Sequence, residues 1–275
     1  ALPVSRVREI VERVVVPVEA IERVAIRSGL GRVLAEDLAS PIDVPSSDNS
    51  AMDGYAVRAA DLASDGPTAL RLVGTALAGQ PFAGRVGPGE AVRVTTGAVM
   101  PDGLDTVVIQ EVTQVDGDRV VVSGGQQQGQ HRRLRGEDLS RGKPALRAGK
   151  LLAPADLGLL ASLGFAEVAV RRRLRVAFFS TGDELRSIGE ALEPGEVYDS
   201  NRYTIYGMLM RLGVDVVDMG VIRDDPDVLE RAVRTAAESA DAIVSSGGVS
   251  VGEADFTKQV MARLGDIAFW TIAMR

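Results

Sequence analysis

VSSGGVSVGEADFT, at residues 244–257, is the stretch that decides the fold of this chain, together with its counterpart FFSTGDEL at residues 178–185. Each begins as an apolar run and then changes to small residues, glycine and carboxylates. A buried parallel strand that ends in such a loop is how open α/β sheets form a ligand crevice. The two stretches therefore predict two strands that end at one binding site.

The side chains of these loops indicate what binds there. Gly247 and Gly248 lack a Cβ, so backbone N–H groups can approach an anion closely, and the neighbouring serines add hydroxyl donors. Glu184, Glu253 and Asp255 supply carboxylate oxygens of the kind that Mg²⁺ prefers. We therefore expect a phosphorylated ligand together with a divalent metal.

Bulk composition is ordinary for a soluble protein. The chain has 275 residues, of which 45% are hydrophobic and 25% charged. Its net charge of -7 argues against general nucleic-acid binding. Cysteine is absent, and no apolar run approaches the roughly 20 residues that span a bilayer, so we expect a cytoplasmic protein without a membrane segment. The single histidine, His131, excludes a multi-histidine metal centre.

The last hundred residues alternate strands and helices. Strands are predicted at residues 175–180, 215–220 and 242–245. Helices are predicted after Asn201 and after Asp225, where a cap is followed by a proline suited to the first helical position. This alternation favours a three-layer α/β domain with a parallel sheet between helices.

Apolar spacing predicts which helix faces are buried. An N-terminal helix would bury Val7, Ile10, Val11 and Val14, with Ser5 as its cap. The helix after Asn201 would bury Ile205, Met208, Leu209 and Leu212, and the helix after Asp225 would bury Leu229, Ala232, Val233 and Ala236.

Glycine and proline punctuate short β-branched runs from about Pro45 to Gly136, which indicates a mainly β insert. Within it, Asp116-Gly117 is a strong hairpin signal. The organisation we expect is an N-terminal helix at 1–19, a small linker domain at 20–47 and 137–172, a β-rich insert at 48–136 and the α/β domain at 173–275.

Several polar clusters allow two interpretations. Asp48, Asn49 and Asp53 either form local turns or belong to a site. Thr95 or Thr96 either closes a strand end or binds phosphate oxygens. The charged run RRLRGED at residues 132–138 is either a solvated face or a site for an anionic substrate.

Residues that precede helices allow the same choice. Asp199 and Asn201 stand just before a helix, so at least one of them could be a helix cap. Asp225 is expected to be a cap, which leaves Asp224 as the freer carboxylate.

Taken together, these segments resemble the molybdopterin molybdenumtransferase family (MoeA), which includes the E domain of gephyrin. The matching pieces, in the family's order from about residue 33 to 275, are DVPSSDNSAMDGYAVR, VRVTTGAVMP, VVIQE, RRLRGEDLSRG, ASLGFAEVAV, FFSTGDEL, VYDSNR, GVIRDDP and SSGGVSVGEADFTK. The resemblance implies an elongated β domain, a small linker domain and an α/β domain similar to the molybdopterin adenylyltransferases. It also implies Mg²⁺-dependent insertion of molybdate into adenylylated molybdopterin, which releases AMP and gives the molybdenum cofactor.

The resemblance also implies partners. Members of the family are homodimers, with the active site between the α/β domain of one subunit and the β insert of the other. A molybdopterin adenylyltransferase is expected to act upstream. Two alternatives stay open: adenylyl transfer to molybdopterin, which the β insert and the DNSAMDGY loop argue against, and a non-catalytic scaffold, as in receptor clustering by the gephyrin E domain.

The resemblance assigns roles to particular residues. Positions that match the family's functional residues are Asp53, Thr96, Asp138, Glu184, Asp224 and Asp255. Residues expected to bind substrate are Ser180, Thr181, Gly182, Asp199, Asn201, Ser245, Gly247, Gly248, Ser250 and Arg275. Glu184 and Asp255 would share the Mg²⁺ ion. Arg275 and residues of the basic linker would meet the pterin phosphate and molybdate; the basic linker comprises Arg132, Arg133, Arg135, Arg141, Lys143, Arg147 and Lys150.

Two departures from the family bear on activity. Thr271 stands where the family usually has a lysine associated with an oxyanion site, and threonine offers one neutral donor in place of a charge. The family also continues beyond Arg275 into a segment with further molybdate ligands. We therefore expect a fragment that binds AMP or adenylylated pterin and inserts molybdate poorly.

Overall fold

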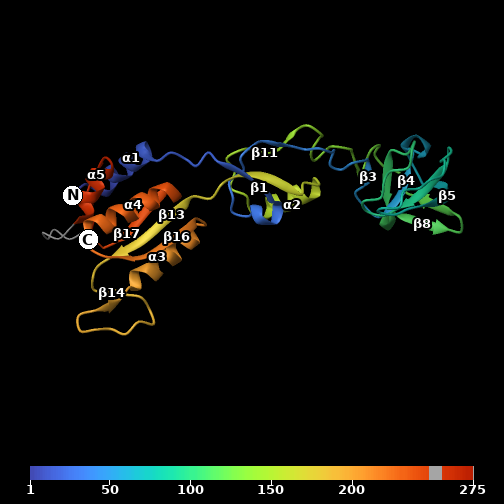
Figure 1. Cartoon of the computed structure of the whole chain (residues 1–275). Coiled ribbons are helices and arrows are strands. Elements are labelled where there is room, and N and C mark those ends of the chain that lie inside the picture. Colours follow the sequence, from blue (N-terminus) through green and yellow to red (C-terminus); the bar gives the residue numbers. More distant parts are fainter. Residues whose placement is uncertain (248–255, 275) are drawn as a thin grey trace. The chain divides into compact units, whose positions relative to one another are not determined.

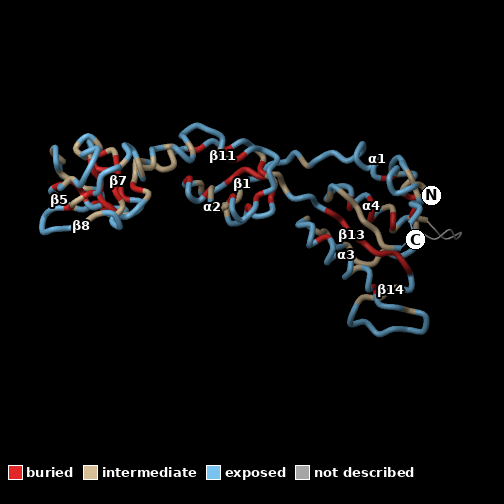
Figure 2. Tube along the Cα trace, turned by 180° about the vertical axis from the view of Figure 1, so that it is seen from behind, coloured by how far each residue is buried: buried red, intermediate tan, exposed pale blue. Residues whose placement is uncertain are grey.

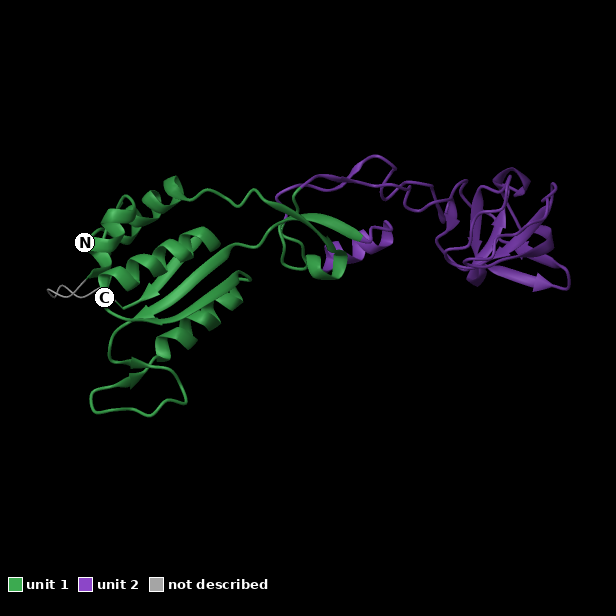
Figure 3. Cartoon of the chain, in the orientation of Figure 1, with its two compact units in different colours: residues 1–35, 151–153, 167–275 green, residues 36–150, 154–166 purple. Residues whose placement is uncertain are grey.

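The structure is a computed structural model that describes residues 1–247 and 256–274. The chain divides into two compact units, which are coloured separately in Figure 3. Unit 1 comprises residues 1–35, 151–153 and 167–275, and unit 2 comprises residues 36–150 and 154–166. The finer division into four parts stays a prediction. No helix in the described ranges is long and apolar enough to cross a membrane.

A three-stranded parallel sheet forms the centre of unit 1 (Figure 1). Its order is β16-β13-β17, with β13 (Arg175–Thr181), β16 (Asp215–Ile222) and β17 (Ala242–Ser246). β13 has a strand on each side and is buried from its second residue to its last. The three strands predicted from the sequence are confirmed.

Helices cover both faces of this sheet. They are α3 (Ser200–Arg211), α4 (Pro226–Ser239) and α5 (Phe256–Leu264). Phe178 packs with Leu209 of α3, whereas its neighbour Phe179 packs with residues of α4 and α5, among them Leu229 and Val260. Successive side chains of a strand point to opposite faces, so β13 fills two cores, and it is red along most of its length in Figure 2. The predicted three-layer α/β fold is confirmed.

α4 begins and packs as its sequence predicts. Asp225 caps the helix, because its Oδ1 accepts from the backbone N–H groups of Asp227 and Val228, both at 2.9 Å. The buried residues of α4 are Leu229, Ala232, Val233 and Ala236, which are the four predicted.

α3 buries less of its apolar surface than predicted. Leu209 is buried and Ile205 partly so, but Met208 is 63% exposed and Leu212 is 75% exposed. Met208 is rotated by roughly 100° from Leu209 around the helix axis, which turns it away from the sheet. Leu212 is already the C-cap residue, so it no longer belongs to the face that packs.

α1 (Val4–Val14) also differs from its prediction. Val7 is buried, but Val11 and Val14 are exposed. The prediction that Ser5 caps this helix is wrong, because the helix begins earlier and Pro3 occupies the cap position without a side-chain hydrogen bond.

Two short strand pairs complete unit 1. β1 (Ile21–Ala25), which leads into the 3₁₀ turn η1 (Ile26–Gly29), pairs antiparallel with β12 (Glu167–Arg171). β14 (Leu185–Arg186) pairs in parallel with β15 (Val197–Tyr198), directly before α3. The N–H of Leu2 donates to the carbonyl of Thr271 at 2.9 Å, so the first residues lie against the last described ones.

Unit 2 is mainly β, as predicted for the insert. Its largest sheet has the order β7-β4-β6-β5-β9-β8. These strands are β4 (Gly54–Val57), β5 (Thr68–Ala76), β6 (Glu90–Val94), β7 (Thr106–Ile109), β8 (Thr113–Asp116) and β9 (Arg119–Val122). Both faces of the sheet are packed, since Ala56 belongs to one apolar cluster and its neighbours Tyr55 and Val57 belong to another.

The predicted hairpin in unit 2 is confirmed with a shift of one residue. Asp116 pairs with Arg119, so the turn consists of Gly117, whose φ is +60°, and Asp118. The other elements of unit 2 are β2 (Leu38–Ala39), β3 (Asn49–Ser50), η2 (Ala59–Asp61), η3 (Gln110–Val112), β10 (Arg132–Arg133), β11 (Pro144–Leu146) and α2 (Pro154–Ser162).

Candidate active site at the ends of the parallel strands

β13 and β17 end side by side in small polar residues. Ser180 pairs with Ser246 in parallel register, and Phe179 pairs with Ser245 one step before. Thr181 is the last residue of β13, and Gly247 follows β17 directly. Because α/β sheets bind ligands at the carboxyl ends of their strands, this edge is the first place to look for a site.

The close approach of these two ends requires glycine. Gly247 has a φ of +93°, and a Cβ there would lie 2.2 Å from the carbonyl oxygen of Thr181. Gly182 has a φ of +150°, and its Cβ would lie 2.6 Å from the carboxylate of Glu184. A side chain at Gly247 would therefore collide with the backbone of Thr181, whereas at Gly182 the flexible Glu184 side chain would have to move.

A small pocket of about 200 Å³ lies at this edge, where α3 begins. Among its lining residues are five that the sequence assigned to the site: Thr181, Glu184, Asp199, Asn201 and Gly247. Asp199 caps α3 by accepting from the N–H of Arg202 at 3.1 Å, and Asn201 Nδ2 donates to Ser246 Oγ at 3.1 Å. Pockets for drug-sized ligands have about 300–1,000 Å³, so this one would hold part of a larger ligand.

Three buried polar atoms at this edge have no hydrogen-bond partner among the described residues: Ser180 Oγ, Thr181 Oγ1 and Asp199 Oδ2. The residues that carry them are at most 4% exposed. A buried polar atom without a partner costs roughly 1–3 kcal/mol. In native proteins such atoms are usually paired with a ligand, an ion or water. This edge is therefore arranged for polar groups that the described residues do not supply.

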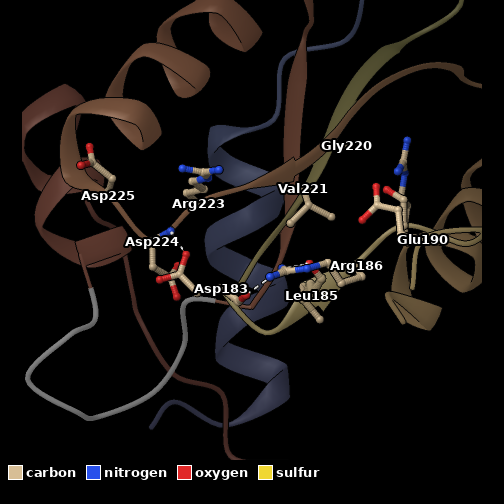
Figure 4. A pocket seen from close by; sticks show the side chains of 12 residues that line it. Asp183, Leu185, Arg186, Glu190, Gly220, Val221, Arg223, Asp224 and Asp225 are labelled. Atoms are coloured by element: carbon tan, nitrogen blue, oxygen red, sulfur yellow. Dashed lines mark hydrogen bonds between the residues drawn. The ribbon is translucent and has the colours of Figure 1, made fainter. Parts of the chain in front are cut away.

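A larger hollow of about 860 Å³ lies where β13 and β16 end (Figure 4). Asp224 and Asp183 lie next to each other in it, and the N–H of Asp224 donates to Asp183 Oδ1 at 3.4 Å. The cationic residues of this hollow are Arg186, Arg202 and Arg223. Leu185 lines both pockets, so Asp224 in the larger one and Glu184 in the smaller one belong to adjacent spaces.

In unit 2, Asp53 and Thr96 form a hydrogen-bonded pair. Asp53 Oδ1 accepts from the backbone N–H of Thr96 at 2.7 Å and from its hydroxyl at 2.9 Å. Both bonds stabilise the carboxylate, so the pKa of Asp53 lies below its ordinary value, with the backbone N–H as the larger cause. The two residues flank the paired positions Gly54 and Val94, which join β4 to β6.

Asp138 forms an ion pair with Arg133 at 2.5 Å. Arg133 also pairs with Glu137 at 2.8 Å and holds the pKa of that carboxyl below its usual range. Two further arginines of the basic linker have carboxylate partners: Arg132 with Asp48 at 2.6 Å and Arg135 with Asp43 at 2.6 Å. An anionic substrate that bound these arginines would therefore compete with carboxylates of the same unit.

Two known families match the chain in its two halves. The MoeA N-terminal region (domain I and II) matches residues 2–164. The chain belongs to the MoeA family. The second match, a probable molybdopterin binding domain, covers residues 177–275. The resemblance derived from the sequence motifs is confirmed.

Similar proteins support the same family. The molybdopterin molybdenumtransferase of Haemophilus influenzae is 44% identical over 255 residues, which are 92% of this chain and 63% of that protein. The protein of the same name from Nostoc sp. is 40% identical over 238 residues, 86% of this chain and 55% of that protein. This MoeA-family chain therefore spans between 55% and 63% of the length of these two relatives.

Solved structures of MoeA proteins have the same fold. Two structures from Pyrococcus horikoshii give TM-scores of 0.84 and 0.83, with 34% and 30% sequence identity. They cover 99% and 90% of this chain and 69% and 66% of their own.

Some predicted residues of the MoeA site lie outside the described residues: Gly248, Ser250, Asp255 and Arg275. The Mg²⁺ pair formed by Glu184 and Asp255 therefore stays a prediction. Within residues 1–247 and 256–274, no group of three or more Asp, Glu or His side chains is arranged to hold a metal.

Sequence reasoning passed over several residues of the larger hollow. Asp183, Arg202 and Arg223 line it, yet none was assigned to the site. Each stands inside a MoeA-like motif, in TGDEL, DSNR and IRDDP respectively, so the motifs themselves were a signal. The family resemblance assigned roles to their neighbours Glu184 and Asp224 and not to these three residues.

Proposed function

We propose that this chain belongs to an enzyme that inserts molybdenum into adenylylated molybdopterin, in a Mg²⁺-dependent step that consumes molybdate and releases AMP. The observation that carries the proposal is the glycine-lined strand end at Thr181 and Gly247, beside three buried polar atoms without partners among the described residues. The name shared by the two relatives supports it.

The groups at this edge would bind different parts of the substrate. Gly247 leaves the backbone open to a phosphate group, and the hydroxyl of Ser246, which lines the small pocket, would donate to its oxygens. The N-terminus of α3 favours negative charge in the small pocket. Asp199 caps that helix and would orient the residues that follow it.

The residues at this edge also fit a Mg²⁺ ion. Glu184 and Thr181 line the same pocket, and the buried hydroxyl of Thr181 has no partner among the described residues. Carboxylate and hydroxyl oxygens are ligands that this ion accepts. Glu184 would hold the ion together with Asp255, and the bound ion would neutralise charge on the phosphates.

We also propose a homodimer in which Asp53 and Thr96 of one subunit meet the strand-end site of the other. The motivation is that Asp53 and Thr96 belong to unit 2, whereas Thr181, Glu184 and Gly247 of the strand-end site belong to unit 1. Light scattering should give twice the 29.0 kDa mass of the chain. Mixing Asp53→Asn subunits with Glu184→Gln subunits should restore part of the activity, because each mixed dimer has one intact site. A monomer mass, or no restored activity, would contradict the shared site.

The alternatives make different predictions. Adenylyl transfer would need ATP and would release pyrophosphate, whereas molybdenum insertion releases AMP without ATP. The match of residues 2–164 to the MoeA N-terminal region favours insertion. A scaffold would show neither reaction. The cytoplasmic location and the upstream adenylyltransferase stay predictions.

The direct test is incubation with adenylylated molybdopterin, molybdate and Mg²⁺. AMP release and activation of a molybdenum-free molybdoenzyme would be measured for this chain and for a version extended to the length of its relatives. We expect both activities in the longer protein, and binding with weak insertion in this chain. Inactivity of both proteins would refute the proposed function. Equal activity would show that the additional length of the relatives matters less than we infer.

A further inference from the structure

β16 contains a bulge just before its end. Phe178 of β13 pairs with Asp218, but Ser180 pairs with Val221, so β16 advances three residues where β13 advances two. Gly220 lies in this bulge with a φ of +78°. Its N–H donates to Asp218 Oδ1 at 3.0 Å, which closes the bulge locally. Bulges are over-represented next to active sites, where they re-aim a side chain or end the pairing of the strand, although they are rare in parallel pairs.

The start of α3 holds the bulge from outside the strand. Arg202 Nε donates to both carboxylate oxygens of Asp218, each at 3.0 Å. Arg202 is itself fixed, because its backbone N–H donates to the cap residue Asp199. We call the contact between these two side chains the Arg202–Asp218 latch.

The segment after the bulge reaches the larger hollow. Val221, Arg223 and Asp224 line it, and so do Gly220 and Arg202. The N–H of Asp224 then meets Asp183, which comes from the end of β13. The direction in which this segment leaves the sheet therefore depends on the bulge, and the bulge depends on Asp218.

We propose that Arg202 is a positioning residue that acts through Asp218 and Gly220 to hold Asp224 and Arg223 against the substrate. Arg202 does so from the helix whose start forms the small pocket, so one residue fixes the geometry of both spaces. This inference rests on the proposed function for its substrate. We expect that lysine does not replace arginine here, because arginine places Nε as the fourth side-chain atom in a rigid planar group, whereas lysine carries its nitrogen one atom further along a flexible stem.

A purely structural ion pair would behave differently. Arg202 and Asp218 are 22% and 34% exposed, and ion pairs near the surface contribute little to stability. Loss of the latch should therefore leave the melting temperature nearly unchanged. If Arg202 is a positioning residue, loss of the latch should make the segment from Gly220 to Asp224 more mobile. Asp224 should then contribute less to substrate binding and turnover.

The experiment compares Arg202→Met and Arg202→Lys with the unchanged chain. Arg234→Lys is the matched control, because Arg234 pairs with Glu230 on α4 of the same unit. The first readout is amide hydrogen exchange at Gly220, which we expect to accelerate about tenfold in both Arg202 variants and not in the control. This readout needs no substrate.

The second readout is kcat and KM for AMP release from adenylylated molybdopterin, in the protein extended to the length of its relatives. Arg202→Met should lower kcat/KM about tenfold in the unchanged background and hardly at all in an Asp224→Asn background, because residues that act as a unit are not additive.

Unchanged exchange at Gly220, or losses that add in the double variant, would overturn the inference. Failure of the proposed function looks different: no AMP release occurs in any variant, while the exchange at Gly220 still shows whether Arg202 holds the bulge.

Discussion

Asp53 and Thr96 stand 43 positions apart, yet one carboxylate oxygen accepts two hydrogen bonds from the same threonine. The sequence could predict that both residues belong to a site, because each lies in a MoeA-like motif. It could not predict their contact, which depends on the pairing of Gly54 with Val94. At the scale of single residues, the motifs therefore identified Asp53 and Thr96 as site residues, whereas their contact follows from the pairing of β4 with β6.

Removing the Thr96 hydroxyl should raise the pKa of Asp53 part of the way towards its ordinary value. In Thr96→Val the backbone N–H, which is the larger cause of the lowering, still donates. Thr95→Val is the control, since the Thr95 hydroxyl instead accepts from the N–H of Ala78. A titration followed by carbon NMR of the Asp53 carboxyl measures the change. An unchanged pKa in Thr96→Val would show that the hydroxyl bond does not form in solution.

Asp241 should make stability depend on pH. The Arg172 guanidinium and the N–H of Arg175 lower its pKa from 3.8 to about 2. Because the folded-state pKa is lowered, this stability is present above pH ~4 and is lost as the pH falls towards 2. Asp241→Asn should reduce the free energy of unfolding by on the order of 1 kcal/mol at neutral pH, since the pair is partly exposed. Urea unfolding at several pH values should show a difference that shrinks below pH ~4; a constant difference would argue against the ion pair.

At the scale of elements, the sequence predicted those helices and strands whose signals lie within their own residues. β13, β16 and β17 were predicted from their apolar runs, and α4 was predicted from its cap residue followed by proline. Both kinds of signal lie within the element itself and depend little on the rest of the fold. α1 and α3 buried less than predicted, because exposure depends on what packs against a helix rather than on its own pattern. The bulge in β16 was not foreseen, since Gly220 looks like any other glycine in the sequence.

Gly74 tests a steric requirement within β5 of unit 2. A Cβ at Gly74 would lie 2.3 Å from the ring of Phe82, and one at Gly84 would lie 2.3 Å from the same ring. Gly74→Ala should therefore cost about 1–3 kcal/mol in the free energy of unfolding. Combination with Phe82→Leu should cost less than the sum of the two changes.

Gly158→Ala is the matched control for Gly74, because a Cβ there meets nothing within 4 Å in the helix α2. It should leave stability unchanged or raise it by up to about 1 kcal/mol. The melting temperatures of Gly74→Ala and Gly158→Ala test this prediction. Equal melting temperatures would mean that Phe82 does not pack against Gly74.

At the scale of the whole molecule, the sequence predicted an α/β part and a mainly β part, and both are present. The strand order of the β sheet could not be predicted, because β5 and β6 pair in parallel although other neighbours in that sheet are antiparallel. β5 and β6 follow each other in the sequence, with only residues 77–89 between them, and nothing in that stretch distinguishes a parallel connection from a hairpin. Asp255, the predicted partner of Glu184 in binding Mg²⁺, lies outside the described residues, so this assignment stays a prediction from the sequence motifs.

The most direct test of the central claim is the affinity of Thr181→Val for adenylylated molybdopterin, measured together with its melting temperature. Valine has the shape of threonine but lacks the hydroxyl, whose oxygen is buried without a partner among the described residues. If the strand end is a binding site, the variant should be as stable as the unchanged chain or more so, because it removes a buried polar atom that the residues 1–247 and 256–274 leave without a partner. It should also bind the ligand about fivefold to tenfold more weakly, because one hydrogen bond contributes about 1 kcal/mol. Unchanged affinity with unchanged stability would contradict the placement of the substrate at the ends of β13 and β17.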